Sequence, residues 1–142
     1  MDVYVRPGDS FWYYSQLFRI PLQLIIDSNR NINPQTIQQG QRIQIPAYVA
    51  QNYQIKSGDS LWSIAMSRNL PLDTLFLINP TLNPNRLQIG QTIQVPLRIT
   101  WRLVNGKQNY TYEVMMNDIQ RLQTVYPFLQ VAPIGNSVLN RS

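Results

Sequence analysis

The pattern of apolar and polar residues changes its period along the chain, and it does so twice in the same order. Short apolar stretches at residues 3–5 and 53–55 predict β-strands. After the second stretch, Leu61, Ile64 and Ala65 stand three and four positions apart, which predicts a helix from about 60 to 68 with one inward apolar face. The first copy keeps this spacing with Phe11, Tyr14, Ser15 and Phe18.

A second helix is predicted in each copy, starting at a proline. Pro21 and Pro71 suit the first turn of a helix, where no amide partner is needed. The helix of the second copy must end near Asn79, because Pro80 disfavours helical backbone at the residue before it. Alternating residues at 92–96, and their counterparts in the first copy, predict a closing strand. Each unit therefore has the order strand, helix, helix, strand, with the strands paired antiparallel under the helices.

The two units are an internal duplication. Residues 3–46 align with residues 53–96 without a gap, and 15 of 44 positions are identical. These are Gly8/Gly58, Asp9/Asp59, Ser10/Ser60, Trp12/Trp62, Pro21/Pro71, Leu22/Leu72, Asn29/Asn79, Asn33/Asn83, Pro34/Pro84, Gln38/Gln88, Gly40/Gly90, Gln41/Gln91, Ile43/Ile93, Gln44/Gln94 and Pro46/Pro96. The sequence predicts an α+β fold with module 1 at 1–46, a linker at 47–52, module 2 at 53–96 and a further segment at 97–142.

The turn from the first strand into the first helix carries the strongest repeated signal, Gly-Asp-Ser-x-Trp. Glycine can adopt a positive φ there, and the aspartate or the serine can cap the helix. We expect Asp59 and Ser60 to start the helix, with Asp59 as its cap. Because Trp62 falls within the helix, we expect its side chain to pack in the core.

Composition narrows the possible chemistry. The chain has no cysteine and no histidine, so it lacks disulfides, a thiolate nucleophile, the usual general base and the commonest zinc ligand. We therefore predict no catalytic residue, no metal site and no cofactor.

Charge and hydropathy bear on partners and location. The net charge of +5 is dispersed and forms no basic run, so no nucleic-acid partner is expected. No stretch approaches the roughly 18 apolar residues of a membrane span. The start of the sequence shows no positively charged region followed by an apolar core, so no signal peptide is expected in the sequence as given.

A repeat of about 45 residues that opens Gly-Asp-Ser-x-Trp and closes Gly-Gln-x-Ile-x-Val-Pro resembles the lysin motif, or LysM, module. The resemblance covers about two thirds of the chain. It implies a βααβ fold and binding of polysaccharides that contain N-acetylglucosamine, chiefly peptidoglycan and chitin. It also implies a groove between the loop after the first strand and the loop that joins the second helix to the second strand.

Carried over by position, the resemblance implies glycan-binding residues in both modules. In module 1 they are Gly8, Asp9, Ser10 and Phe11 on one wall and Asn29, Arg30, Asn31 and Ile32 on the other, together with Ser28. In module 2 they are Gly58, Asp59, Ser60 and Leu61 on one wall and Ile78, Asn79, Pro80, Thr81 and Leu82 on the other. Glycine allows the backbone to approach the sugar amide, and Ile32 or Leu82 can receive the acetyl methyl. Two weak sites on a short tether gain avidity on a repeating polymer.

Residues 97–142 do not repeat the module. Asn105-Gly106 predicts a hairpin over residues 101–110. A helix is predicted from the possible cap Thr111 to before Pro127, followed by a strand over 129–134 and a turn at Gly135. The apolar face of this helix is Met115, Ile119, Leu122 and Tyr126.

This last segment is similar to the opening of the zinc carboxypeptidase family. The motifs are Tyr110-Thr111-Tyr112, Asp118-Ile119-x-x-Leu122, Tyr126-Pro127 and Ile134-Gly135-x-Ser137-Val138. The resemblance implies kinship with bacterial peptidases that carry LysM modules and cleave γ-D-glutamyl-diamino acid bonds in peptidoglycan. The His-x-x-Glu zinc motif of that family has no counterpart here. The segment is either the beginning of a truncated peptidase domain or a small appended structure.

Three hypotheses for function follow. The first is a glycan-binding protein, most simply for peptidoglycan, that is located in the cell wall or spore envelope of a bacterium. The second is the N-terminal part of a zinc-dependent peptidoglycan peptidase. The third is a structural scaffold in a spore or wall layer. The sequence leaves the oligomeric state open.

Overall fold

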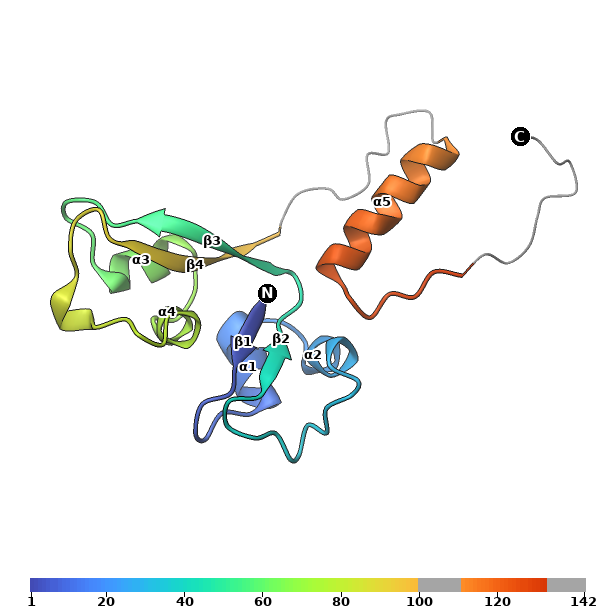
Figure 1. Ribbon diagram of the computed structural model, residues 1–142, viewed down its shortest axis with the longest axis horizontal. Coiled ribbons are helices and arrows are strands. Elements are labelled where there is room, and N and C mark those ends of the chain that lie inside the picture. The colour runs from blue at the N-terminus through green and yellow to red at the C-terminus, as the bar shows by residue number, and fades with distance from the viewer. Residues whose placement is uncertain (100–110, 133–142) are drawn as a thin grey trace, which may run out of the picture. The chain divides into compact units, whose positions relative to one another are not determined.

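The computed structural model describes residues 1–99 and 111–132 (Figure 1). The chain divides into two compact units, residues 1–101 and 102–142, and the first unit contains both repeats. Module 1 consists of β1 (Asp2–Tyr4), α1 (Phe11–Phe18), α2 (Leu22–Ser28) and β2 (Arg42–Gln44). Module 2 consists of β3 (Tyr48–Gln54), α3 (Leu61–Ser67), α4 (Asp73–Ile78), a short 3₁₀ helix (Pro84–Arg86) and β4 (Thr92–Arg98). The predicted order of strand, helix, helix, strand is confirmed in both modules.

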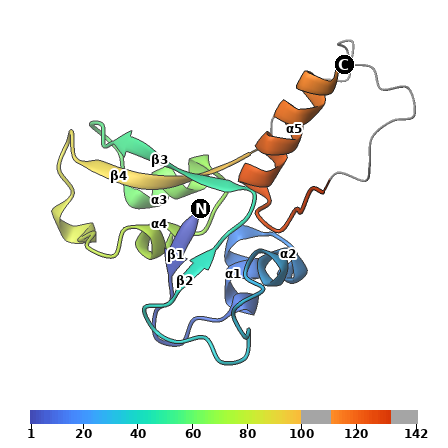
Figure 2. The same ribbon diagram turned by 45° about the vertical axis from the view of Figure 1, so that its right-hand side comes forward.

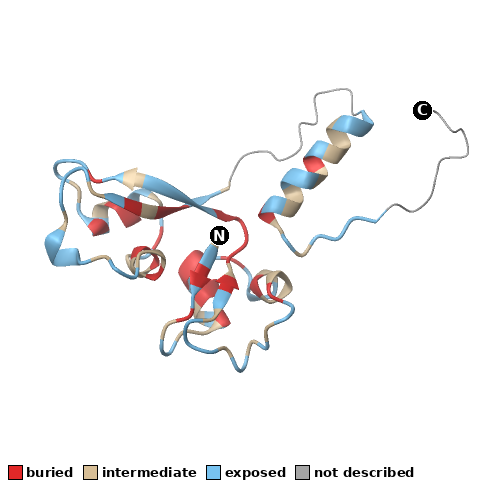
Figure 3. Ribbon diagram, in the orientation of Figure 1, coloured by how far each residue is buried: buried red, intermediate tan, exposed pale blue. Residues whose placement is uncertain are grey.

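Each module has one two-stranded antiparallel sheet. In module 1, Val3 lies opposite Ile43 on the paired strands β1 and β2. In module 2, β3 and β4 pair along their whole length, with Tyr53 opposite Ile93. Val3 and Ile43 of module 1 and Ile93 and Val95 of module 2 are buried, whereas residues 49–52 of β3 are exposed (Figure 3).

Residues 47–52 differ from the predicted linker. β3 begins at Tyr48, so most of this stretch belongs to a strand. The reason is that β4 continues past Pro96 to Arg98, which places Leu97 opposite Val49 and Arg98 opposite Tyr48. Pro96 is tolerated because a two-stranded sheet leaves one side of each strand without a ladder partner.

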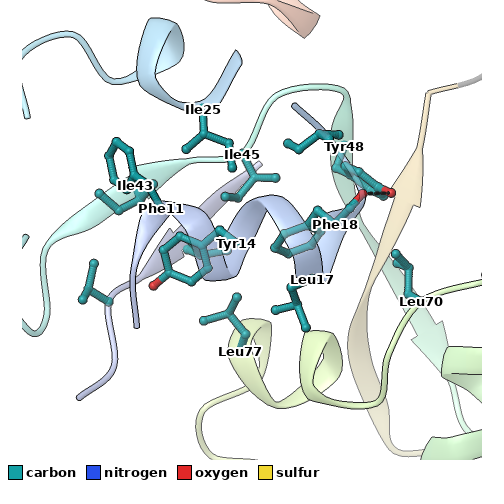
Figure 4. Packing of buried hydrophobic residues seen from close by; sticks show 13 residues of the cluster. Phe11, Tyr14, Leu17, Phe18, Ile25, Ile43, Ile45, Tyr48, Leu70 and Leu77 are labelled. Atoms are coloured by element: carbon teal, nitrogen blue, oxygen red, sulfur yellow. Dashed lines mark hydrogen bonds between the residues drawn. The ribbon is translucent and has the colours of Figure 1, made fainter. Parts of the chain in front are cut away.

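The core of module 1 contains side chains from both repeats (Figure 4). Its aromatic centre is Phe11, Tyr14 and Phe18, as the helix phase predicts, and Leu70 and Leu77 of the second repeat pack against it. Tyr48 also belongs to this core, and its hydroxyl donates to the carbonyl oxygen of Phe18 at 2.9 Å. A separate core in module 2 is formed by Ile55, Leu61, Ile64, Ala65, Leu75, Ile93 and Val95.

Polar contacts join the two modules around these leucines. Arg6 and Asp73 form an ion pair, with 2.6 Å between Nη2 and Oδ2 and 3.0 Å between Nη1 and Oδ1. The Tyr13 hydroxyl donates to the same carboxylate at 2.6 Å, and Arg19 donates to Asn69 Oδ1 at 3.0 Å. Figure 1 and Figure 2 both show α4 beside β1, in agreement with the contacts between these elements. The modules are therefore packed together rather than only tethered.

In the second unit, α5 (Tyr112–Val125) confirms the predicted helix. Thr111 caps it by accepting a hydrogen bond from the amide of Val114 at 3.3 Å, and the helix ends before Pro127. The predicted strand over 129–134 is wrong in its described part, since residues 129–132 are irregular. There the Leu129 amide donates to the Tyr126 carbonyl, and Gln123 donates to the Leu129 carbonyl, so the chain turns back on the helix end. Residues 133–134, Gly135 and the predicted hairpin lie outside the described residues.

None of the helices within residues 1–99 and 111–132 has the length and apolar character needed to cross a lipid bilayer.

Candidate functional site

The turn before the first helix is closed by its aspartate. In module 1 the Asp9 amide donates to the Arg6 carbonyl at 3.1 Å, and the Arg6 amide donates back to Asp9 Oδ2 at 3.2 Å. Module 2 repeats both bonds between Asp59 and Lys56, at 3.1 and 2.8 Å. The glycine in each turn has a positive φ, +82° for Gly8 and +86° for Gly58, a conformation that glycine adopts without a steric penalty. The repeated Gly-Asp pair thus specifies a rigid turn with exposed backbone.

The helix cap is the serine, not the aspartate. Ser10 Oγ accepts from the Tyr13 amide and Ser60 Oγ accepts from the Ser63 amide, both at 3.0 Å. Ser63 returns the bond by accepting from the Ser60 amide, which completes a capping box. The prediction that Asp59 caps the helix is therefore wrong, because its carboxylate is already engaged with the amide of Lys56.

A tyrosine hydroxyl supports the aspartate in each module, but from a different element. In module 1 it is Tyr14 of α1, which donates to Asp9 Oδ2 at 2.9 Å. In module 2 it is Tyr53 of β3, which donates to Asp59 Oδ2 at 2.7 Å. The Lys56 amide and then the Tyr53 hydroxyl lower the pKa of Asp59, while burial and then Asp9 raise the pKa of Tyr14. At neutral pH the turn of module 2 thus carries an ionised Asp59 held by hydrogen bonds.

The second predicted wall is anchored by one asparagine per module. Asn29 Nδ2 donates to the carbonyls of Ile25 and Gln44 at 2.7 and 2.9 Å, and its Oδ1 accepts from the Gln44 amide at 2.8 Å. Asn79 makes the same three bonds with Leu75 and Gln94, at 2.8, 2.8 and 2.7 Å. These side chains tie the end of the second helix to the closing strand, so their amides are not free to bind a ligand.

The loop that follows each asparagine makes a tight turn. The Ile32 amide donates to the Asn29 carbonyl at 2.9 Å, and the Leu82 amide donates to the Asn79 carbonyl at 3.0 Å. Ile32 and Leu82 are partly buried against the core of their own module. The turn leaves two consecutive residues exposed in each module. They are Arg30 and Asn31 in module 1, and Pro80 and Thr81 in module 2.

The predicted site residues fall into groups by exposure. The exposed ones are Gly8, Arg30, Asn31, Gly58, Ser60, Pro80 and Thr81, whereas Asp9, Ser10, Ser28, Ile32, Asp59, Ile78, Asn79 and Leu82 are half-buried. Phe11, Leu61 and Asn29 are buried, so their side chains serve the interior of the fold. Ile78 packs against the core of module 1. Contact with a ligand at Phe11, Leu61 and Asn29 would have to use backbone atoms.

The prediction that Trp62 packs in the core, made because it lies within the helix, is wrong, and the equivalent Trp12 is exposed as well. Trp12 is 63% exposed and Trp62 is 64% exposed, so neither side chain is part of the core. Phe11 and Leu61, one position earlier, take the inward direction at the start of each helix. A hydrophobic residue beside an inward one in a helix is rotated by about 100° from it, which was the signal available in the sequence.

Sequence reasoning also missed the contact between the modules. Asp73 binds Arg6, which belongs to the turn of module 1, so module 2 supports that turn. Its hydrogen bond with Arg6 lowers the pKa of Asp73, while the carboxylate raises the pKa of the Tyr13 hydroxyl. The available signal was the difference between aligned positions, because Leu77 of module 2 replaces Asp27 of module 1.

A shallow hollow of about 460 Å³ lies beside the turn of module 2 and is lined by Asn52, Tyr53, Gln54, Lys56 and Thr92. It contains none of the predicted glycan-binding residues. The equivalent positions of module 1 include Val3, which is buried, so the duplication does not repeat it. The turns and loops that recur in both modules are the better candidate site.

Two βααβ units, each with a glycine turn closed by aspartate and a loop anchored by asparagine, define a tandem-module protein. Residues 3–46 and 53–96 each match the model of the LysM domain. The chain belongs to the LysM family. Modules of this family bind glycans that contain N-acetylglucosamine, such as peptidoglycan or chitin, and the chain is a carbohydrate-binding protein of this class.

The chain is also similar to gamma-D-glutamyl-L-diamino acid endopeptidase 1 of Lysinibacillus sphaericus. The two are 78% identical over 139 residues, which cover 98% of this chain and 35% of the relative. The chain therefore spans about a third of the length of that relative. This similarity agrees with the resemblance of residues 97–142 to a peptidase family.

Among solved structures, the LysM domain from Volvox carteri chitinase is 44% identical, covers 34% of this chain and 98% of its own, and superposes with a TM-score of 0.33. The spore cortex-lytic enzyme SleL of Bacillus megaterium QM B1551 is 27% identical, covers 68% of this chain and 22% of its own, and gives a TM-score of 0.34. TM-scores this low support no conclusion about the fold by themselves.

Proposed function

We propose that both modules bind peptidoglycan through the backbone exposed at their paired turns. The carrying observation is that each turn is fixed by its own hydrogen bonds, Asp9 with Arg6 and Asp59 with Lys56, which leaves the glycine peptide accessible. A preformed turn loses little conformational freedom when a sugar binds. The proposed contacts are the residues of the two predicted walls, with backbone atoms acting at the buried positions.

Peptidoglycan is proposed over chitin because of the similarity to an endopeptidase whose name specifies a γ-D-glutamyl-L-diamino acid substrate. Such a bond belongs to a cell-wall peptide. The net charge of +5 also favours an anionic wall polymer. We accordingly propose a location at the cell wall or spore envelope.

We further propose that the chain itself is not catalytic and serves to place a peptidase of this type on its substrate. The observation in support is the lack of histidine and cysteine, which leaves none of the usual ligands for a catalytic zinc other than carboxylates. Zinc-dependent cleavage of a purified muropeptide by this chain would contradict the proposal. A role as a structural scaffold remains the alternative if neither glycan is bound.

The test is co-sedimentation with purified peptidoglycan and, separately, with chitin. Retention on peptidoglycan is expected, and failure to be retained on either polymer would overturn the proposal. A double variant, Gly8→Ala with Gly58→Ala, should reduce retention because each new methyl stands where the sugar approaches the backbone.

The matched control is Gly40→Ala with Gly90→Ala. These glycines also have positive φ values, +80° and +84°, and open space around the added Cβ, as Gly8 and Gly58 do. The strain of substitution is therefore comparable in both pairs. An equal loss of retention in the two double variants would indicate a stability effect rather than a binding site.

A further inference from the structure

Trp12 and Trp62 are large apolar side chains that the fold leaves in water. A single exposed hydrophobic residue is ordinary in a soluble protein. Here, however, the same residue type stands at the same position of both modules with nearly the same exposure, 63% and 64%. The two modules differ at most of their aligned positions, so the agreement is informative.

Many of the other positions shared by the modules have a structural role. The glycines take positive φ values, Asp9 and Asp59 close turns, Ser10 and Ser60 cap helices, and Asn29 and Asn79 bridge helix and strand. Gln41 and Gln91 accept from the amides of Gln38 and Gln88, and Ile43 and Ile93 are buried. The indoles of Trp12 and Trp62 take part in neither core cluster. Their retention is therefore not explained by packing.

Both tryptophans continue a proposed binding wall. Each follows the capping serine by two positions and the last wall residue, Phe11 or Leu61, by one. Because Phe11 and Leu61 point into the core, the next side chain of the helix points out of it beside the exposed turn. The indole is thus adjacent to the backbone that is proposed to meet the glycan.

We infer that Trp12 and Trp62 are sugar-stacking residues, one in each module, that bind the face of a pyranose ring of the glycan. This rests on the proposed function and extends its site beyond the two predicted walls. An indole offers a broad flat surface with a negative face, which suits the apolar C–H face of a sugar ring. One platform per module suits a polymer that presents the same ring repeatedly.

The surroundings favour a sugar over an apolar protein partner. One helical turn after Trp62 stands Met66, which is 50% exposed, but the equivalent position after Trp12 is the polar Gln16. A protein-docking face would need a contiguous apolar patch, and these modules do not share one. What they share is an isolated aromatic surface, which is sufficient for one sugar ring.

The test compares Trp12→Ala, Trp62→Ala and the double variant with the parent chain, using calorimetric titration with soluble fragments of peptidoglycan and with chitin oligosaccharides. We expect each single variant to weaken binding by about tenfold at its own module. The double variant should weaken it further while its unfolding midpoint stays close to that of the parent. Trp12→Tyr and Trp62→Tyr should restore most of the affinity, since a phenol ring can also stack.

The matched control is Tyr4→Ala. Tyr4 is an aromatic residue with 60% exposure in module 1, but its counterpart in module 2 is Gln54, so it is not repeated. This variant should bind as the parent does. In a Trp101→Phe background the remaining tryptophans are Trp12 and Trp62, so addition of the oligosaccharide should change the tryptophan fluorescence of the chain, and an unchanged spectrum at saturation would contradict stacking.

The outcomes separate the two proposals. If the parent binds glycan and the double alanine variant binds equally well, the stacking role is refuted and the proposed function stands. If the parent binds neither oligosaccharide nor polymer, both are refuted. Loss of binding in Tyr4→Ala equal to that in the tryptophan variants would show a general surface effect and would also refute stacking.

Discussion

At the scale of single residues, Asn29 and Asn79 have a structural role that the family resemblance does not imply. Both positions were assigned to the binding wall through the family resemblance. In the structure each side chain uses both of its amide donors and its carbonyl oxygen within the module. Only an amide side chain supplies two donors and an acceptor at one end of a short stem, which explains the identity of the two positions.

We predict that Asn29→Ala destabilises the chain by about 3 kcal/mol. The substitution removes three hydrogen bonds, one to the buried Ile25 carbonyl and two with the half-buried backbone of Gln44. Urea unfolding followed by circular dichroism would measure the change. Asn31→Ala, at an exposed position two residues later, should change stability by less than about 0.5 kcal/mol. Equal effects of the two substitutions would contradict the anchoring role.

The carboxylate of Asp73 provides a second prediction at this scale. The hydrogen bond from Arg6 lowers the pKa of Asp73 in the folded chain, so its contribution to stability is present above the pKa of the unfolded state, near 4, and is lost as the pH falls through the folded value. Asp73→Asn should therefore destabilise the chain at pH 7 and have a shrinking effect towards pH 2.

The expected difference for Asp73→Asn at pH 7 is about 1 kcal/mol, because the pair is about one third exposed and is screened by solvent. Denaturation at several pH values would follow it. Asp27→Asn serves as the control, since Asp27 accepts a hydrogen bond from Gln23 within its own helix. A constant difference across the whole pH range would exclude the ion pair as the cause.

At the scale of elements, the sequence predicts helices and strands well where local chemistry decides them. The spacing of Leu61, Ile64 and Ala65 sets the buried face of α3, and Pro80 limits α4. It fails where a distant partner decides. Residues 48–52 extend β3 only because β4 runs on to Arg98. The exposure of Trp62 is a local effect, because its neighbour Leu61 occupies the inward direction. The family resemblance implies which residues form the candidate walls, whereas the hydrogen bonds that shape these walls are seen only in the structure.

The short helices should depend strongly on their caps. α3 has seven residues, and an isolated helix of that length is unstable in water. We predict that Ser60→Ala destabilises the chain by about 1 kcal/mol through loss of the hydrogen bond that the Ser63 amide donates to Ser60 Oγ. Thermal unfolding would detect the change. Ser57→Ala, in the exposed turn outside the helix, should leave the midpoint nearly unchanged, and a comparable loss there would argue against capping as the cause.

At the scale of the whole first unit, the two modules share a core. Leu77 belongs to α4 of module 2 but packs with the residues of module 1. The sequence predicts two modules joined by a short linker but no contact between them, because neither repeat by itself reveals which of its positions face the other module. Comparison of the repeats does reveal it, since Leu17 and Leu77 each have a polar counterpart, Ser67 and Asp27.

We predict that Leu77→Ala destabilises module 1, although the substitution lies in module 2. Loss of a buried leucine should amount to about 2–4 kcal/mol. Hydrogen exchange should then show reduced protection of α1 and β1. Leu75→Ala is the matched control, because Leu75 lies two residues before Leu77 in α4 and is buried in the core of module 2. Its protection loss should centre on α3 and β4, and the same pattern in both variants would contradict a shared core.

The contact between the modules is directional. Module 1 contributes Arg6, Tyr13 and Leu17 to the contact, and module 2 contributes Asp73 and Leu77. The reverse surfaces are not available, because module 2 carries Ser63 and Ser67 where module 1 has Tyr13 and Leu17, and module 1 carries Asp27 where module 2 has Leu77.

A head-to-tail contact that could repeat would build open-ended filaments from separate molecules. Because the two copies differ at the contacting positions, the contact forms once, between module 1 and module 2 of the same chain. The duplication thus doubles the proposed sugar-binding surface without giving free molecules a means to polymerise through the same contact.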